Sequence, residues 1–122
     1  LYIESTNGST YWIGGIDDKE RIEKILGTEY GTIHENEASQ LSFESHEILK
    51  TRLNPQGNMR GLMIADYNPP SIHHWGYKIN HTNINQVTNK PIINNGRYAS
   101  LQMNPKDNIG NLSEDYIETL ES

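Results

Sequence analysis

The sequence predicts an α/β fold, a mostly parallel sheet flanked by helices and preceded by an antiparallel hairpin. Three observations predict it. An Asn-Gly pair lies between apolar segments near the N-terminus. Short apolar runs then alternate with segments of helical periodicity, as in strand–helix–strand units. Finally, residues 61–65 form an unbroken Gly-Leu-Met-Ile-Ala run, which is typical of a strand covered on both faces.

Residues 1–13 predict the hairpin. Apolar residues, Ile3 before and Tyr11-Trp12-Ile13 after, flank Asn7-Gly8. We expect a two-residue turn at Asn7-Gly8, with positive φ at both positions.

A helix is predicted over residues 19–26. Asp17 or Asp18 would cap its start, because acidic residues favour the positive end of a helix. Gly27 would cap its end. The apolar residues near helical spacing are Ile16, Ile22, Ile25 and Leu26.

The central part of the chain predicts two strands joined by a helix. The strands would cover residues 30–35 and 60–67. Ser42 would cap the helix, which runs to about Leu53. Its predicted buried stripe is Phe43, Ile48, Leu49 and Leu53.

The remaining segments predict less regular structure. Ser71 would cap a short helix through Trp75 and Tyr77, and the Asn-rich residues 80–95 would form a surface excursion. Residues 97–103 predict a third strand. A last helix would begin at Ser113, with Ile117 and Leu120 on one face.

Composition excludes several functions. The 122 residues carry a net charge of −6, which disfavours strong DNA binding by the chain alone. Cysteine is absent, so disulfides, thiolate zinc sites and a cysteine nucleophile are excluded. No apolar stretch approaches the roughly 20 residues that cross a bilayer, and no signal peptide is visible.

Polar side chains follow two predicted strands where each strand ends. Glu35, Asn36 and Glu37 end the first, and Asp66 and Asn68 end the second. Ligands of α/β sheets bind at the carboxyl ends of strands, and nucleotide hydrolases place Mg²⁺-shell and water-orienting groups there. The alternatives are a solvated acidic loop at the first end and an Asx turn before proline at the second.

The histidines do not match a metal motif. His73 and His74 are adjacent, which on a helix separates them by about 100°, and no i, i+4 pair is present. We interpret the histidines as surface or packing residues. A small metal-dependent hydrolase that uses His34, Glu37, Asp66 and His73 remains an alternative.

The order of the sequence motifs resembles one family over nearly the whole chain. The most specific segments are Asn68-Pro-Pro-Ser-Ile-His-His-Trp75 and Asn104-Pro-Lys-Asp-Asn108. Others are Gly14-Gly-Ile-Asp-Asp18, Asn36-Glu-Ala-Ser-Gln40 and Thr51-Arg-Leu-Asn54. Together they resemble the large subunit of tailed-phage terminases, in the branch found in many prophages.

This resemblance implies an ATP-driven motor that packages viral DNA, with an ATPase half like the P-loop NTPases and a nuclease half. Thr32–Glu37 occupies the Walker B position, which makes Glu37 the catalytic glutamate and places Asn36 where a Mg²⁺-shell aspartate often lies. Asp66 and Asn68 match the coupling motif that senses the γ-phosphate, with Asp66 orienting Asn68. Arg52 would form an ion pair or act on a neighbouring subunit's phosphates.

The resemblance also implies cofactors and partners. These are ATP and Mg²⁺, double-stranded DNA, the terminase small subunit, the portal protein and further copies in a homo-oligomeric motor, in the cytoplasm of the bacterial host. Residues 1–122 would be the C-terminal part of the ATPase domain, with the phosphate-binding loop upstream and the nuclease downstream. The alternative is a non-catalytic prophage remnant that keeps only the fold and partner surfaces.

Overall fold

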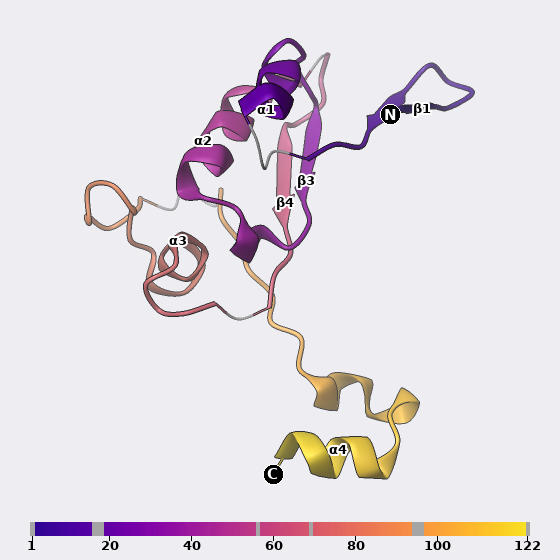
Figure 1. Ribbon diagram of the computed structural model, residues 1–122, viewed down its shortest axis with the longest axis vertical. Helices are drawn as coiled ribbons and strands as arrows, with labels where there is room; N and C mark the ends of the chain where they lie inside the picture. The colour runs from indigo at the N-terminus through magenta and orange to yellow at the C-terminus, as the bar shows by residue number, and fades with distance from the viewer. Residues whose placement is uncertain (1, 16–18, 56, 69, 94–96, 122) are drawn as a thin grey trace. The chain divides into compact units, whose positions relative to one another are not determined.

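A computed structural model describes residues 2–15, 19–55, 57–68, 70–93 and 97–121 (Figure 1). The chain divides into two compact units, residues 1–92 and residues 93–122. The first unit holds two small two-stranded sheets, one antiparallel and one parallel, with short helices. The α/β class predicted from the sequence is confirmed at this level. None of the helices in the described ranges is both long and apolar enough to cross a membrane.

The predicted hairpin is confirmed, but its turn differs. Strand β1 (Tyr2–Glu4) pairs with β2 (Thr10–Trp12) in antiparallel register. Ser5 O accepts the N–H of Gly8 at 3.0 Å, and Ser5 N–H donates to Ser9 O at 2.8 Å. Only Gly8 in this turn has positive φ, at 90°. The predicted two-residue turn is therefore wrong; the connection is a three-residue loop that ends in a left-handed glycine.

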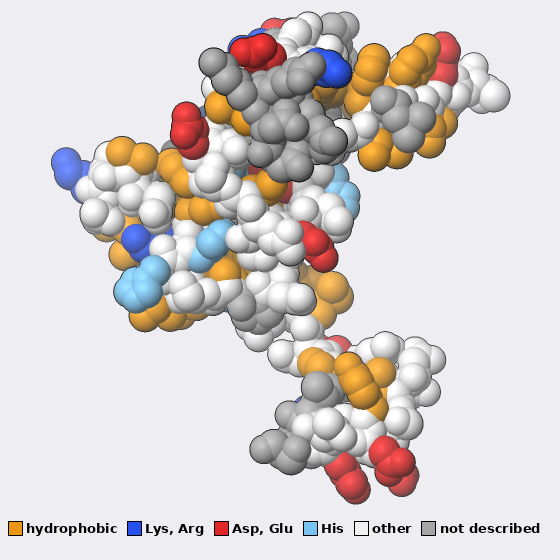
Figure 2. All heavy atoms as spheres, viewed as in Figure 1, with side chains coloured by type: hydrophobic (Ala, Val, Ile, Leu, Met, Phe, Trp, Pro, Cys, Tyr) orange, Lys and Arg blue, Asp and Glu red, His pale blue; other side chains and the backbone are white. Residues whose placement is uncertain are grey.

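The hairpin exposes its apolar side chains. Figure 2 shows them as a hydrophobic surface over the hairpin. The rings of Tyr2 and Trp12 lie 4.8 Å apart between centroids, so they cover each other in part. The exposed residues are Tyr2, Ile3, Tyr11, Trp12 and Ile13.

A parallel strand–helix–strand unit forms the centre of the first unit. Strand β3 (Thr32–Glu35) and strand β4 (Leu62–Ala65) pair in parallel, with Glu35 opposite Ala65. Parallel neighbours need a long crossover. Here it contains the 3₁₀ turn Ala38–Gln40 and helix α2 (Phe43–Thr51). Ser42 caps α2 as predicted, because its hydroxyl accepts the Ser45 N–H at 3.1 Å.

Helix α1 (Lys19–Leu26) has the predicted bounds and packs against α2. Its predicted N-caps, Asp17 and Asp18, lie outside the described residues, as does Ile16. Gly27 follows the helix in a turn but does not adopt the left-handed conformation.

The two faces of the β3–β4 pair differ. Side chains alternate along a strand, and paired residues share a face, so Ile33 and Glu35 lie on one face and His34 and Ile64 on the other. Helix α2 covers the first face, where Ile33 and Glu35 are buried. On the second face Leu62 is 52% exposed and Ile64 is 45% exposed. The prediction that this apolar strand is covered on both faces is wrong for the described residues, because α2 packs on one face only.

The segment after β4 begins its helix later than predicted. Helix α3 (Trp75–Tyr77) continues into a π-helical turn over Lys78–Thr82. The N-cap is His74, whose Nδ1 accepts the Gly76 N–H at 3.0 Å. Residues 83–93 then form a loop closed by an isolated bridge between Ile84 and Pro91. The predicted surface excursion over residues 80–95 agrees with this loop, but its first three residues belong to the π-helical turn and residues 94 and 95 lie outside the described residues.

The second unit contains the 3₁₀ segment Pro105–Asn111 and helix α4 (Glu114–Glu121). Ser113 caps α4 as predicted, since its hydroxyl accepts the Tyr116 N–H at 3.2 Å. The predicted third strand over residues 97–103 is wrong, because that segment is irregular and pairs with no strand in the described part of the chain. Leu101 is 85% exposed there, so its apolar pattern does not reflect burial.

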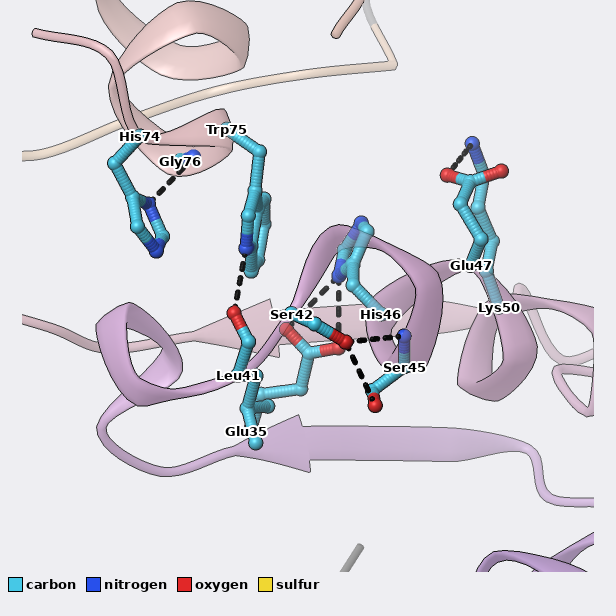
Figure 3. A network of polar contacts seen from close by, with 10 residues as sticks. All are labelled: Glu35, Leu41, Ser42, Ser45, His46, Glu47, Lys50, His74, Trp75 and Gly76. Atoms are coloured by element: carbon cyan, nitrogen blue, oxygen red, sulfur yellow. Dashed lines mark hydrogen bonds and ion pairs between the residues drawn. The ribbon is translucent and has the colours of Figure 1, made fainter. Parts of the chain in front are cut away.

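The core is small and contains a charged residue. Among the described side chains the buried apolar residues are Ile33, Ala38, Leu49 and Trp75. Glu35 is buried with them, and its carboxylate oxygens lie 2.8 and 3.0 Å from His46 Nδ1 on α2 (Figure 3). A carboxylate only accepts hydrogen bonds. We therefore infer that Nδ1 carries the hydrogen in this contact.

The same imidazole links a third element to the core. The rings of His46 and Trp75 stack with centroids 4.3 Å apart. The Trp75 indole N–H donates to Leu41 O at 2.7 Å (Figure 3). The Glu35–His46–Trp75 contacts therefore join β3, α2 and α3.

His46→Ala should destabilise the fold by about 3–5 kcal/mol, because it leaves the Glu35 carboxylate buried without its partner. Urea unfolding followed by circular dichroism measures this loss. His34→Ala is the matched control, since the His34 side chain is 58% exposed and its removal should cost less than about 1 kcal/mol. Equal losses in the two variants would contradict the assigned role of His46.

Candidate functional site

The carboxyl ends of β3 and β4 meet at one edge, as the sequence predicts. Backbone pairing continues beyond the strands: Asp66 N–H donates to Glu35 O at 3.1 Å, and Ala38 N–H donates to Asp66 O at 2.8 Å. The segment 35–38 therefore lies directly beside Asp66. This places the polar strand ends identified in the sequence next to each other.

The Asp66 carboxylate contacts two residues at the end of β3, Glu37 and His34. Its Oδ1 accepts the backbone N–H of Glu37 at 3.1 Å, and its Oδ2 lies 2.6 Å from His34 Nε2. His34 is opposite Ile64, and Asp66 directly follows β4, two residues beyond Ile64, so the alternation of side chains places Asp66 on the same exposed side as His34. The contact is open to water, since the His34 and Asp66 side chains are 58% and 51% exposed.

These contacts lower the pKa of Asp66 below its ordinary value of 3.8. The largest cause is the hydrogen bond from the Glu37 N–H; the His34 hydrogen bond and charge act in the same direction, while partial desolvation opposes them. Asp66 is therefore ionised at neutral pH. Because a carboxylate is an acceptor only, Nε2 of His34 carries the hydrogen in this pair.

Glu37 has an unusual backbone. Its φ and ψ are both 52°, which is the left-handed region that side chains other than glycine rarely adopt. This conformation costs an ordinary residue roughly 1–2 kcal/mol. It turns the chain from β3 into the 3₁₀ turn and leaves the Glu37 side chain exposed at the edge. Strain of this kind clusters at functional sites.

The other candidate residues are divided between the two ends of the sheet. Asn36 and Asn68 are exposed and flank Glu37 and Asp66 in sequence at the carboxyl edge. Arg52 lies at the opposite end, because its carbonyl accepts the Tyr30 N–H at 2.8 Å before β3 begins. The backbone of Arg52 is thus not brought together with the carboxyl-edge residues.

The carboxyl edge presents hydrogen-bond acceptors, such as the carboxylates of Glu37 and Asp66. No group of three or more His, Asp or Glu side chains in the described ranges is placed to hold a metal ion. Of the four residues of the alternative metal hydrolase, His34 and Asp66 contact each other, and His73 N–H bonds locally to Ser71.

Sequence reasoning missed the burial of Glu35, which it grouped with the polar strand end. The signal was present, because Glu35 is two residues from Ile33 and so shares its face. The packing role expected for the histidines is confirmed for His46. The His34–Asp66 contact joins residues far apart in sequence and required the strand register.

No family model, no curated protein and no solved structure matches this chain.

Asp66→Asn should reduce the loss of stability on acidification. A carboxyl whose folded pKa is lowered stabilises the fold fully above its unfolded pKa, and this contribution disappears as the pH falls through the folded pKa. The difference in urea midpoint between wild type and variant should therefore be constant above the unfolded carboxyl pKa of about 4, and it should shrink as the pH falls through the lower folded pKa. Glu47→Gln on α2 is the control: this half-exposed carboxylate lies 3.8 Å from Lys50 in a surface ion pair, and its removal should change the urea midpoint little at any pH.

Glu37→Gly should be more stable than Glu37→Ala by about 1 kcal/mol. Both variants remove the carboxylate, so the difference isolates the backbone conformation. Urea unfolding of the two proteins measures it. An alanine variant as stable as the glycine variant would show that residue 37 is not left-handed in solution.

Proposed function

We propose that this chain is part of the ATPase domain of a phage or prophage terminase large subunit, the ATP-driven motor that packages viral DNA. The finer fold in this proposal is a partial P-loop NTPase-like domain. Residues 1–122 would be its C-terminal part, with the phosphate-binding loop preceding it and the nuclease following it. The sequence resemblance motivates the proposal.

The observation that carries the proposal is the meeting of the two polar strand ends. Parallel strands joined by a helical crossover bind nucleotides at their carboxyl edge. Here that edge brings Glu37 beside Asp66, with a 3.1 Å hydrogen bond between them. A carboxylate exposed at such an edge, on a constrained backbone, is suited to orient an attacking water.

The proposed chemistry assigns one role to each residue. Glu37 polarises the water that attacks the γ-phosphate of ATP, and Asn68 senses the phosphate through its amide. Asn36 would hold a water of the Mg²⁺ shell, since an amide oxygen is a suitable acceptor but carries no charge. Mg²⁺ supplies neutralisation of the phosphate charge when bound.

The proposed roles of Arg52, DNA and the partner proteins concern the full-length motor. The backbone of Arg52 lies at the other end of the strands from the carboxyl edge. Of its two suggested roles, we favour a structural ion pair over an action on the phosphates of a neighbouring subunit. DNA, the small subunit and the portal protein would bind the full-length protein. The net charge of −6 fits a chain that does not bind DNA strongly by itself.

Glu37→Gln in the protein extended to its phosphate-binding loop should keep ATP binding and lower turnover at least about 100-fold, because an amide cannot accept a proton from water. Phosphate release and equilibrium ATP binding measure the two properties. Glu47→Gln, a half-exposed glutamate on α2, is the matched control and should leave both unchanged.

Two results would contradict the proposal. Unchanged turnover in Glu37→Gln removes Glu37 from the catalytic role. Encoding DNA that lacks an in-frame Gly-Lys-Ser/Thr loop upstream favours the non-catalytic remnant.

The 122-residue chain by itself should release no phosphate from ATP above background, since the cationic phosphate-binding loop does most of the positioning.

A further inference from the structure

Asp66 is the residue that engages the Glu37 turn most fully. Its backbone N–H bonds to Glu35 and its backbone carbonyl accepts from Ala38, so the peptide groups on both sides of residues 36–37 are tied to one residue. Its carboxylate Oδ1 accepts the N–H of Glu37 itself. These three hydrogen bonds span the bend at which the chain leaves β3.

The Glu37 N–H needs an acceptor that a strand cannot supply. In the left-handed conformation the chain turns away from the strand ladder, and the N–H of Glu37 is paired with a side chain rather than a carbonyl. A charge-assisted hydrogen bond to a carboxylate is stronger than a neutral one. It therefore offsets part of the cost of the left-handed backbone.

His34 contacts the other oxygen of the Asp66 carboxylate. The Nε2 of His34 contacts Oδ2, leaving Oδ1 directed at the Glu37 N–H. Both side chains come from the exposed face of the β3–β4 pair, so the contact needs no burial. The two oxygens of the Asp66 carboxylate thus contact the His34 imidazole and the Glu37 peptide N–H.

We infer that Asp66 is a positioning residue, with His34 as its support: its carboxylate holds Glu37 in the left-handed conformation and so sets where the Glu37 side chain lies at the carboxyl edge. The geometric part of this inference is independent of any activity. Its consequence for ATP hydrolysis rests on the proposed function.

Nuclear magnetic resonance of the ¹⁵N-labelled 122-residue chain tests the geometric part. Positive φ gives a strong intraresidue contact between the amide and α protons of Glu37. Asp66→Ala should weaken this contact to the strength typical of negative φ and speed exchange of the Glu37 amide hydrogen about tenfold or more. Asp66→Asn keeps a carbonyl acceptor, so it should retain the positive-φ signal with a smaller increase in exchange.

Two further variants separate positioning from a general loss of stability. His34→Ala should speed exchange of the Glu37 amide while leaving the amide of Leu49 in the core unchanged. Glu47→Gln, on α2 and outside these hydrogen bonds, should leave the Glu37 signal and exchange as in the wild type. An unaltered Glu37 signal and exchange rate in Asp66→Ala would overturn the inference.

The kinetic arm uses the extended protein that contains the phosphate-binding loop. Asp66→Ala should lower kcat for ATP about tenfold or more with little change in KM, and Asp66→Asn should restore part of that loss. If Glu37→Gln leaves turnover intact, the proposed function fails while the resonance result stands. If Glu37→Gln stops turnover and Asp66→Ala does not lower kcat, the positioning role is overturned and the proposed function stands.

Discussion

The first unit depends on one buried carboxylate. Glu35 has no exposed side-chain area, and His46 lies within hydrogen-bond distance of both its oxygens. Removing a carboxylate from water is costly unless it is paired. Helix α2 must therefore lie where His46 reaches Glu35. Few apolar side chains are buried among the described residues, so this polar contact acts beside a small apolar core in positioning α2.

The same contact brings α3 to the core. Trp75 stacks on the His46 ring, and its indole N–H is satisfied by the Leu41 carbonyl. An aromatic ring buried in this way contributes both apolar area and a hydrogen bond. Three elements from separate parts of the chain thus share one polar centre, which specifies their arrangement more narrowly than a purely apolar contact would.

Successive side chains of β3 point to opposite faces, so the residue that maintains the core and the residue that contacts the candidate site are neighbours in sequence. Glu35 points to the covered face and maintains the packing, while its neighbour His34 points to the open face and contacts Asp66. The carboxyl edge is therefore built on a strand whose inward side is anchored. Rigid support of this kind is what a positioned carboxylate such as Glu37 needs, because small displacements weaken its interaction with a water or a phosphate.

Local sequence was sufficient to predict most of the helices and strands. The helices at 43–51 and 114–121 begin after the predicted serine caps, the helix at 19–26 follows from its apolar spacing, and the hairpin follows from Asn-Gly flanked by apolar residues. These signals involve residues close together in sequence, so they can be recognised without knowing the tertiary structure. The exceptions are also instructive: the Asn-Gly turn took a three-residue form, and the apolar run at 97–103 found no strand partner.

Tertiary structure decided the rest, because pairing between distant segments is not encoded in either segment alone. The sequence indicated that the ends of two strands could meet, but the register that sets Glu35 opposite Ala65 determines which side chains touch. That register directs Asp66 to His34 and to the Glu37 peptide. It also leaves one sheet face open, an outcome that depends on where α2 packs rather than on the apolar content of the strand.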